Sequence, residues 1–142
     1  MKLRPINYQD IQFLYESIKE FSEYLEELQI KREVPPFEQH ERFVKKYLED
    51  YENHPFKAWY IVENEGTRIG NFTVKKNNEF GYNIKKQYQG KGLGTKSFEL
   101  FFKIHPKEEV WARTNIKNER SQKILKKFGF VLSDYEFHYR IG

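Results

Sequence analysis

A glycine-rich run between a strand-like segment and a helical segment carries the residues best suited to chemistry. It reads Gln89-Gly90-Lys91-Gly92-Leu93-Gly94-Thr95. Three glycines within five residues let the backbone approach a ligand closely and adopt positive φ angles. Backbone N–H groups at a helix N-terminus bind anions. We therefore predict that this run binds a phosphate group, the alternative being a flexible strand-to-helix turn.

The two best-known phosphate loops do not fit this run. A P-loop needs a glycine directly before Lys-Ser/Thr, but Thr95 precedes Lys96 and Ser97. The dinucleotide-binding motif needs a third glycine where Thr95 stands. The predicted phosphate site is therefore of another type.

Cysteine chemistry is excluded by composition. The chain has no cysteine, so it has no disulfide, no zinc–thiolate site and no cysteine nucleophile. Its four histidines are scattered, without a pair at metal-ligand spacing: His40, His54, His105 and His138. We predict no metal site, and any group transfer must proceed without a covalent cysteine intermediate.

The elements that must position this run predict one α+β domain covering residues 1–142. Apolar residues recur at helical spacing in residues 11–28, 43–51, 97–104 and 119–127, with Asp10 placed as the N-cap of the first helix. β-Branched and aromatic residues mark strands at residues 3–6, 58–62, 68–74, 80–84, 110–114, 130–132 and 135–141. We expect a mostly antiparallel mixed sheet of about six or seven strands, flanked by about four helices.

Two motifs in this order resemble the cofactor segments of the GNAT superfamily of N-acetyltransferases. Gln89-x-x-Gly92-x-Gly94, preceded by Glu79-Phe80-Gly81-Tyr82, is similar to the family's pyrophosphate loop and the strand before it. Asn118-x-x-Ser121, followed by Phe128-Gly129-Phe130, is similar to its second cofactor segment. The resemblance spans nearly the whole chain and is nearest to the branch that acetylates the N-termini of ribosomal proteins.

The resemblance implies acetyl-CoA as the acetyl donor. The pyrophosphate is expected on the backbone amides of the run, and the pantetheine arm along the strand that ends at Ile84. The expected cofactor-binding residues are Tyr82, Ile84, Gln89, Gly90, Lys91, Gly92, Gly94, Thr95 and Asn118. The implied reaction is acetyl transfer to a primary amine, and without a cysteine we expect direct transfer in a ternary complex.

The same resemblance suggests two catalytic residues. Glu79 stands where several family members carry a carboxylate base, although it could equally be a solvent-facing turn residue. Many members use a tyrosine as general acid where this chain has Leu125. Ser121 is the candidate for that role, as in the ribosomal-protein branch, and is otherwise a small polar residue on a helix face. The tyrosines that remain as alternatives are Tyr82, Tyr135 and Tyr139.

The charge distribution bears on the acceptor. Residues 1–55 hold 8 basic and 12 acidic side chains, whereas residues 56–142 hold 17 and 9. In the family the first two helices shape the acceptor pocket, so their acidity here would suit a cationic small-molecule amine or a basic peptide N-terminus. Exposed glutamates are otherwise only a solvated face. The residues concerned are Glu16, Glu20, Glu23, Glu26, Glu27 and Glu33.

Two other functions remain open from the sequence. A catalytically weak acyl-CoA-binding module would keep the fold and account for Leu125. A nucleic-acid binder would use the basic half, but neither an RNP-like nor a helix-turn-helix pattern is present, so we expect no nucleic acid partner. No apolar run approaches the about 18 residues of a membrane span. We therefore expect a cytoplasmic protein without a membrane partner, and a homodimer is left open.

Overall fold

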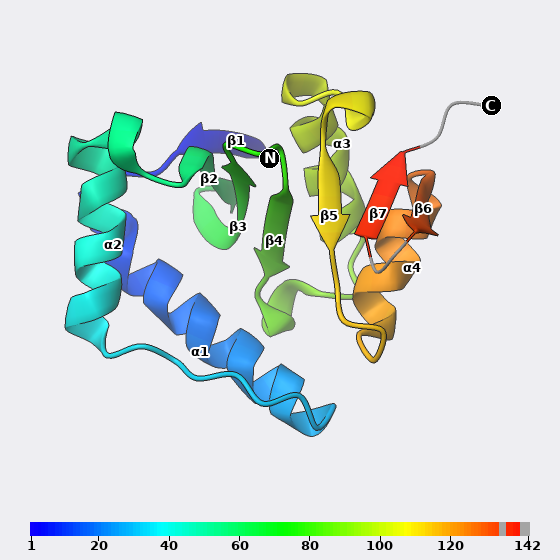
Figure 1. Cartoon of the computed structure of the whole chain (residues 1–142), viewed down its shortest axis with the longest axis horizontal. Coiled ribbons are helices and arrows are strands. Elements are labelled where there is room, and N and C mark those ends of the chain that lie inside the picture. Colours follow the sequence, from blue (N-terminus) through cyan, green and yellow to red (C-terminus); the bar gives the residue numbers. More distant parts are fainter. Residues whose placement is uncertain (134–135, 140–142) are drawn as a thin grey trace.

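The computed structural model describes residues 1–133 and 136–139, and its elements follow the predicted order (Figure 1). The strands are β1 (Lys2–Pro5), β2 (Phe56–Asn64), β3 (Thr67–Lys75), β4 (Phe80–Ile84), β5 (Trp111–Arg113), β6 (Phe130–Ser133) and β7 (Glu136–Tyr139). The helices are α1 (Ile11–Glu27), α2 (Phe37–Glu49), α3 (Leu93–Ile104) and α4 (Glu119–Lys127), with short 3-10 turns that include η1 (Tyr8–Asp10), η3 (Lys86–Tyr88) and η4 (Lys107–Glu109). Tyr135 and the predicted end of the last strand lie outside the described residues. No helix among the described residues is long and apolar enough to cross a membrane.

The strands form two sheets rather than one, and the α+β class is confirmed. The first sheet has the order β1-β2-β3-β4 and the second the order β5-β7-β6, with every strand pair antiparallel. Among residues 1–133 and 136–139, the sheets meet at one parallel bridge between Glu79 and Trp111, after which β4 and β5 separate (Figure 1).

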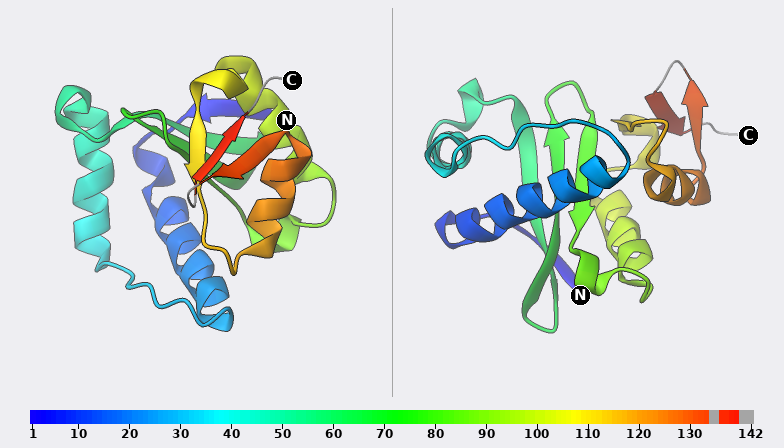
Figure 2. Two further views of the ribbon diagram at one scale, coloured as in Figure 1. Left: turned by 45° about the vertical axis from the view of Figure 1, so that its right-hand side comes forward. Right: turned by 90° about the horizontal axis from the view of Figure 1, so that it is seen from below.

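Both faces of the first sheet are covered by helices (Figure 2). Successive side chains of a strand point to opposite faces. Along β2, Trp59 and Ile61 pack in the cluster that contains side chains of α1 and α2, whereas Ala58 and Val62 pack in the cluster that contains α3. This alternation fixes α1 and α3 on opposite sides of the sheet.

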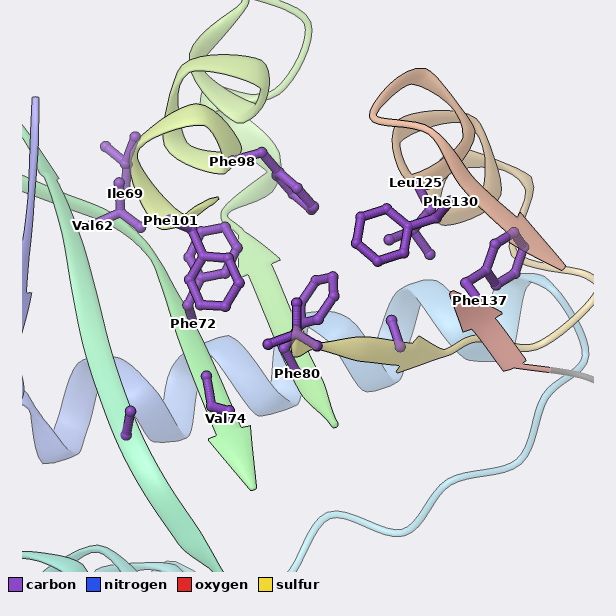
Figure 3. Close-up of a cluster of buried hydrophobic side chains, with 13 residues drawn as sticks. Val62, Ile69, Phe72, Val74, Phe80, Phe98, Phe101, Leu125, Phe130 and Phe137 are labelled. Atoms are coloured by element: carbon purple, nitrogen blue, oxygen red, sulfur yellow. The ribbon is translucent and has the colours of Figure 1, made fainter. Parts of the chain in front are cut away.

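Aromatic rings hold the two sheets together although their backbones meet only once (Figure 3). Phe101 of α3 stacks on Phe72 of β3, with ring centroids 4.6 Å apart. Phe80 of β4 lies 5.7 Å from Phe130 of β6, centroid to centroid. One continuous core therefore extends from the first sheet to the second.

Asp10 has a different role from the predicted helix cap. It occupies the N-cap position of α1 but makes no capping hydrogen bond, because its carboxylate faces the sheet. The fully buried carboxylate accepts hydrogen bonds from Arg4 at 2.8 Å, from Arg68 at 2.7 Å and from the backbone N–H of Asn7 at 2.8 Å. Burial alone would raise the pKa of Asp10, but the hydrogen bonds from Arg4 and Arg68 outweigh it and hold this pKa below its usual value.

We predict that Asp10→Asn lowers the free energy of unfolding by about 3 kcal/mol at pH 7, because it leaves two arginines without their shared carboxylate. A depressed pKa contributes stability above the unfolded-state value near 4, and this contribution is lost as the pH falls through the folded-state pKa. The difference between the two proteins should therefore shrink below about pH 4. Urea unfolding at several pH values measures it.

The control is Glu41→Gln, which removes an exposed pair with Lys45 at 3.8 Å and should cost less than about 1 kcal/mol. A loss for Asp10→Asn no larger than that of the control at pH 7 would contradict the assigned role of Asp10.

Candidate active site

The outer edge of β4 is open. Phe80–Ile84 pairs with β3 on one side. On the other side, Glu79 alone bridges to Trp111, and β5 then pairs with β7. Within the described part of the chain no strand covers this edge. Unpaired N–H and C=O groups along a strand edge can bind an extended ligand as an additional strand would bind.

The glycine-rich run lies at the C-terminal end of β4 and forms the start of α3. The helix begins at Leu93, four residues earlier than predicted, and Gly92 is its N-cap with φ 76°. The N–H groups of residues 90–95 donate to no acceptor among the described residues. The amide of Gln89 donates to the Lys86 carbonyl at 3.1 Å and is already satisfied. Six consecutive amides therefore remain to bind an anion.

Basic side chains surround these amides. Lys91 and Lys96 are exposed on the loop and the first turn of α3. Lys127 at the end of α4 donates to the Thr95 hydroxyl at 3.1 Å. Free amides, a helix N-terminus and nearby ammonium groups together fit a diphosphate group.

Three predicted residues meet between β4 and α4. The Tyr82 hydroxyl is hydrogen-bonded to the Ser121 hydroxyl. Asn118 caps α4 by accepting from the Ser121 N–H at 3.2 Å. Burial raises the pKa of Tyr82 well above its usual value, so its hydroxyl stays protonated near neutral pH. The pair can therefore donate hydrogen bonds to a group on the open edge of β4.

Glu79 is fixed at the other end of β4. Its backbone N–H donates to the Asn77 side chain at 3.0 Å, and its carbonyl accepts from the Lys75 N–H at 2.8 Å. Its carboxylate lies 3.5 Å from the Lys75 ammonium, with 16% of the side chain exposed. Alternation along the strand places Glu79 on the face covered by α1 and Tyr82 on the face covered by α3. The two predicted catalytic residues, Glu79 and Ser121, thus flank the open edge from opposite faces.

The other residues considered as acids lie elsewhere. Leu125 is completely buried in the core, so a side chain at this position faces the packed interior. The Tyr139 ring packs 6.0 Å from Phe130 and beneath the Lys107 ammonium. Tyr135 lies outside the described residues. Of Tyr82 and Tyr139, the two candidates that the structure describes, Tyr82 is the one hydrogen-bonded to Ser121.

A cleft of about 230 Å³ lies between α1 and the glycine-rich loop. Its α1 wall holds three of the six glutamates that the sequence singled out. The lining residues are Glu20, Phe21, Glu23, Tyr24, Glu27, Asn83, Lys86, Gln89 and Arg120. Across residues 1–133 and 136–139, no group of three or more His, Cys, Asp or Glu side chains could hold a metal ion.

Tyr24 and Arg120 are residues that the sequence did not reveal. The Tyr24 hydroxyl donates to the Asn118 side chain at 3.2 Å. Arg120 lies over the Tyr24 ring, 3.7 Å from its centroid, and donates to the side-chain oxygen of Gln89. The signal that could have found Arg120 is its place inside the Asn118-x-x-Ser121 motif, next to a capping residue.

Comparison with known proteins shows the family of this chain. The model of the acetyltransferase (GNAT) domain family matches residues 1–131. The chain therefore belongs to the GNAT acetyltransferase family, as the sequence predicted. It is an acetyl-CoA-dependent N-acetyltransferase that transfers acetyl groups to an amine. Comparison with curated protein sequences gives no match.

Solved structures show the same fold at low identity. A chimera of the spermidine N-acetyltransferase SpeG from Vibrio cholerae with hSSAT is 21% identical, with TM-score 0.69, covering 94% of this chain and 82% of that one. The ribosomal-protein α-N-acetyltransferase RimL in complex with coenzyme A is 14% identical, with TM-score 0.71, covering 96% and 88%.

We predict that Gly92→Val weakens acetyl-CoA binding at least tenfold, measured by calorimetry. A β-branched residue does not adopt φ 76° readily, so the free amides around it must move. Gly66→Val is the matched control. Gly66 has φ 78°, and a Cβ there would meet no atom within 4 Å, as at Gly92, but Gly66 lies in the β2–β3 turn. It should lose similar stability and keep its affinity.

Gly94 allows a further distinction within the loop. A Cβ at Gly94 would lie 3.7 Å from Ile124, which is an ordinary contact. We expect Gly94→Val also to weaken acetyl-CoA binding at least tenfold, through bulk beside the diphosphate and not through a changed φ angle. Unchanged affinity in a folded Gly92→Val protein would remove the loop from the cofactor site.

Proposed function

We propose that residues 1–142 act as one domain that transfers the acetyl group of acetyl-CoA directly to a primary amine, with both reactants bound together. The observation that carries this proposal is the open edge of β4, which ends in the six free amides of residues 90–95. The open strand edge can bind a ligand arm that carries amide groups, and the free loop amides at its end can bind a diphosphate attached to that arm.

The cofactor supplies an activated acetyl thioester. Its diphosphate is assigned to the amides of residues 90–95 and the adjacent lysines, and its pantetheine arm to the open edge of β4, with Tyr82, Ile84 and Asn118 beside it. Hydrogen bonds to charged groups contribute about 1.5 to 3 kcal/mol each, so several such amides supply much of a micromolar affinity. The acetyl end of the arm then lies toward Glu79, away from the loop.

Glu79 is assigned as the base, directly or through a water. Deprotonating an alkylamine of pKa about 10.4 costs about 4 kcal/mol at pH 7.5, whereas an α-amine of pKa about 8 is deprotonated at little cost. The carboxylate is held on the face of β4 that α1 covers, and Asn83, which lines the cleft, lies on the same face nearer the loop. It accepts the amine proton as the new C–N bond forms.

Ser121 and Tyr82 are assigned to the leaving sulfur. When the C–S bond breaks, negative charge develops on the thiolate, and a hydroxyl donor beside it stabilises that charge. The Tyr82 hydroxyl supports the Ser121 hydroxyl by hydrogen bonding, so the Ser121 proton can point at the sulfur. This arrangement takes over the role of the tyrosine that Leu125 replaces.

The charged part of the acceptor is assigned to the cleft between α1 and the glycine-rich loop. Its reacting amine must extend from there along β4 to Glu79, which suits a long acceptor. Glu20, Glu23 and Glu27 line this cleft together with Lys86 and Arg120. Glu20 is already paired with Lys85 at 3.4 Å, so Glu23 and Glu27 are the carboxylates that favour an amine with positive charge. The two similar structures are named for spermidine and for the N-terminus of a ribosomal protein, both of which present an amine. We favour a cationic small-molecule amine, with a peptide N-terminus as the alternative acceptor.

Steady-state kinetics on an amine panel test this assignment. With acetyl-CoA and a monoamine, a polyamine and a basic N-terminal peptide, we expect turnover to be fastest with a multiply charged acceptor. Double-reciprocal lines should intersect, because both reactants must be bound before transfer. Parallel lines or an isolable acetyl-enzyme would contradict direct transfer, and preference for an uncharged amine would contradict the acidic cleft as acceptor site.

We predict that Glu79→Gln lowers kcat/KM by about 10² to 10⁴ and that the loss shrinks as the pH rises, because more of the amine then arrives neutral. The loss should be larger for an alkylamine than for an α-amine. Acetyl-CoA affinity should not change.

Ser121→Ala is the contrasting variant for this experiment. It should lower kcat about 10- to 100-fold, and this loss should persist at high pH because it concerns the thiolate and not the amine. A pH-independent loss of less than threefold in Glu79→Gln on both amines would return Glu79 to the role of a turn residue.

A further inference from the structure

Arg120 lies on the boundary between the two halves of the proposed site. Its guanidinium rests on the Tyr24 ring at 3.7 Å and donates to the Gln89 side chain, directly before the six free amides. It is also part of the lining of the cleft that contains Glu20, Glu23 and Glu27. One cation therefore touches both the acceptor helix and the cofactor loop.

The two halves attract this cation in opposite directions. In the cleft its positive charge adds to that of Lys86 and to that of Lys85, which pairs with Glu20 at 3.4 Å. Together these charges offset part of the field of the glutamates and oppose entry of a cationic amine. At the loop it would meet a diphosphate, which guanidinium groups bind strongly through charge-assisted hydrogen bonds. Residue Gln89, its present partner, is a neutral acceptor and a weaker competitor.

We propose that Arg120 couples cofactor binding to acceptor binding. Without cofactor, Arg120 lies on the Tyr24 ring, where its positive charge partly neutralises the acidic cleft. When the diphosphate binds, Arg120 leaves Tyr24 for the phosphate oxygens and exposes the glutamates to the acceptor. The amine therefore binds more tightly after the cofactor, and by linkage the cofactor binds more tightly after the amine, by the same factor.

The surrounding contacts allow this movement without unfolding the site. Asn118 caps α4 and accepts from Tyr24 independently of Arg120, so α1 and α4 stay connected when the guanidinium leaves. Arg120 is exposed at the first turn of α4, and its side chain can turn toward the loop without moving the helix. The coupling rests on the function proposed above, and its test is separate from turnover.

Calorimetry with coenzyme A, which carries no acetyl group to transfer, measures the coupling, with spermidine as the cationic probe. In the unaltered protein, saturating coenzyme A should tighten spermidine binding at least fivefold. In Arg120→Ala, spermidine should bind at least threefold more tightly without coenzyme A, and coenzyme A should change this affinity less than twofold. Arg120→Ala should also weaken coenzyme A binding at least threefold.

Arg42→Ala is the matched control, because it removes one exposed arginine from α2 and should behave like the unaltered protein. Nuclear magnetic resonance tests the movement without any acceptor. The Arg120 Hε signal should show an upfield ring-current shift that Tyr24→Leu abolishes, and coenzyme A alone should remove this shift.

The outcomes separate this proposal from the proposed function. Spermidine affinity that is independent of coenzyme A, or an Arg120 ring-current shift that persists with coenzyme A bound, would overturn the coupling whether or not acetyl transfer occurs. If spermidine does not bind, the assignment of the cationic acceptor fails, and the resonance experiment alone decides whether Arg120 moves.

Discussion

The proposed site depends on the backbone pairing of β4 with β5, which forms at one end of the two strands and does not continue along them. β4 and β5 start side by side, where the Trp111 N–H donates to the Asn78 carbonyl at 3.1 Å and the Trp111 indole donates to the Asn77 carbonyl at 2.9 Å. They then part, because β5 pairs with β7 instead. Buried backbone groups without partners are costly, so such a gap persists only where water or a ligand reaches it. The aromatic core between Phe80 and Phe130 keeps the sheets in place around the gap. The binding surface is therefore mostly main chain.

The sequence predicted the elements well because their periodicity is local. The bounds of α4 agree with the prediction, since Asn118 caps it and Gly129 follows its end. The start of α3 was predicted too late, because glycines are unfavourable inside helices and Leu93-Gly94 was assigned to the loop. This difference matters for the site. The first turn of α3 lies within the glycine-rich run, so the helix N-terminus and the loop amides form one continuous surface, to which we assign the diphosphate.

Contacts between distant residues could not be predicted from local pattern. The capping rule correctly placed Asp10 at the start of α1, but its carboxylate bonds Arg68, 58 positions away. Tyr24 and Asn118 are 94 positions apart, and their hydrogen bond exists only because α1 and α4 meet near the end of β4. The motif residues Ser121 and Tyr82 were recognised singly, whereas their hydrogen bond follows from tertiary structure. Recognition of the family thus supplied the cofactor, and the structure supplied the neighbours of each residue.

The opposite charges of the two halves of the chain suit the proposed binding of two unlike reactants at one site. Residues 1–55 carry the acidic excess and residues 56–142 the basic one, and the fold places the α1 wall of the cleft beside the loop of the basic half. An anionic donor and a cationic acceptor are therefore each attracted to a different wall. Acetylation converts one ammonium group into a neutral amide, so the product carries one positive charge fewer and is attracted less strongly to the glutamates of the cleft. This weaker attraction favours its departure, and in the proposed coupling Arg120 returns to the cleft once the diphosphate has also left.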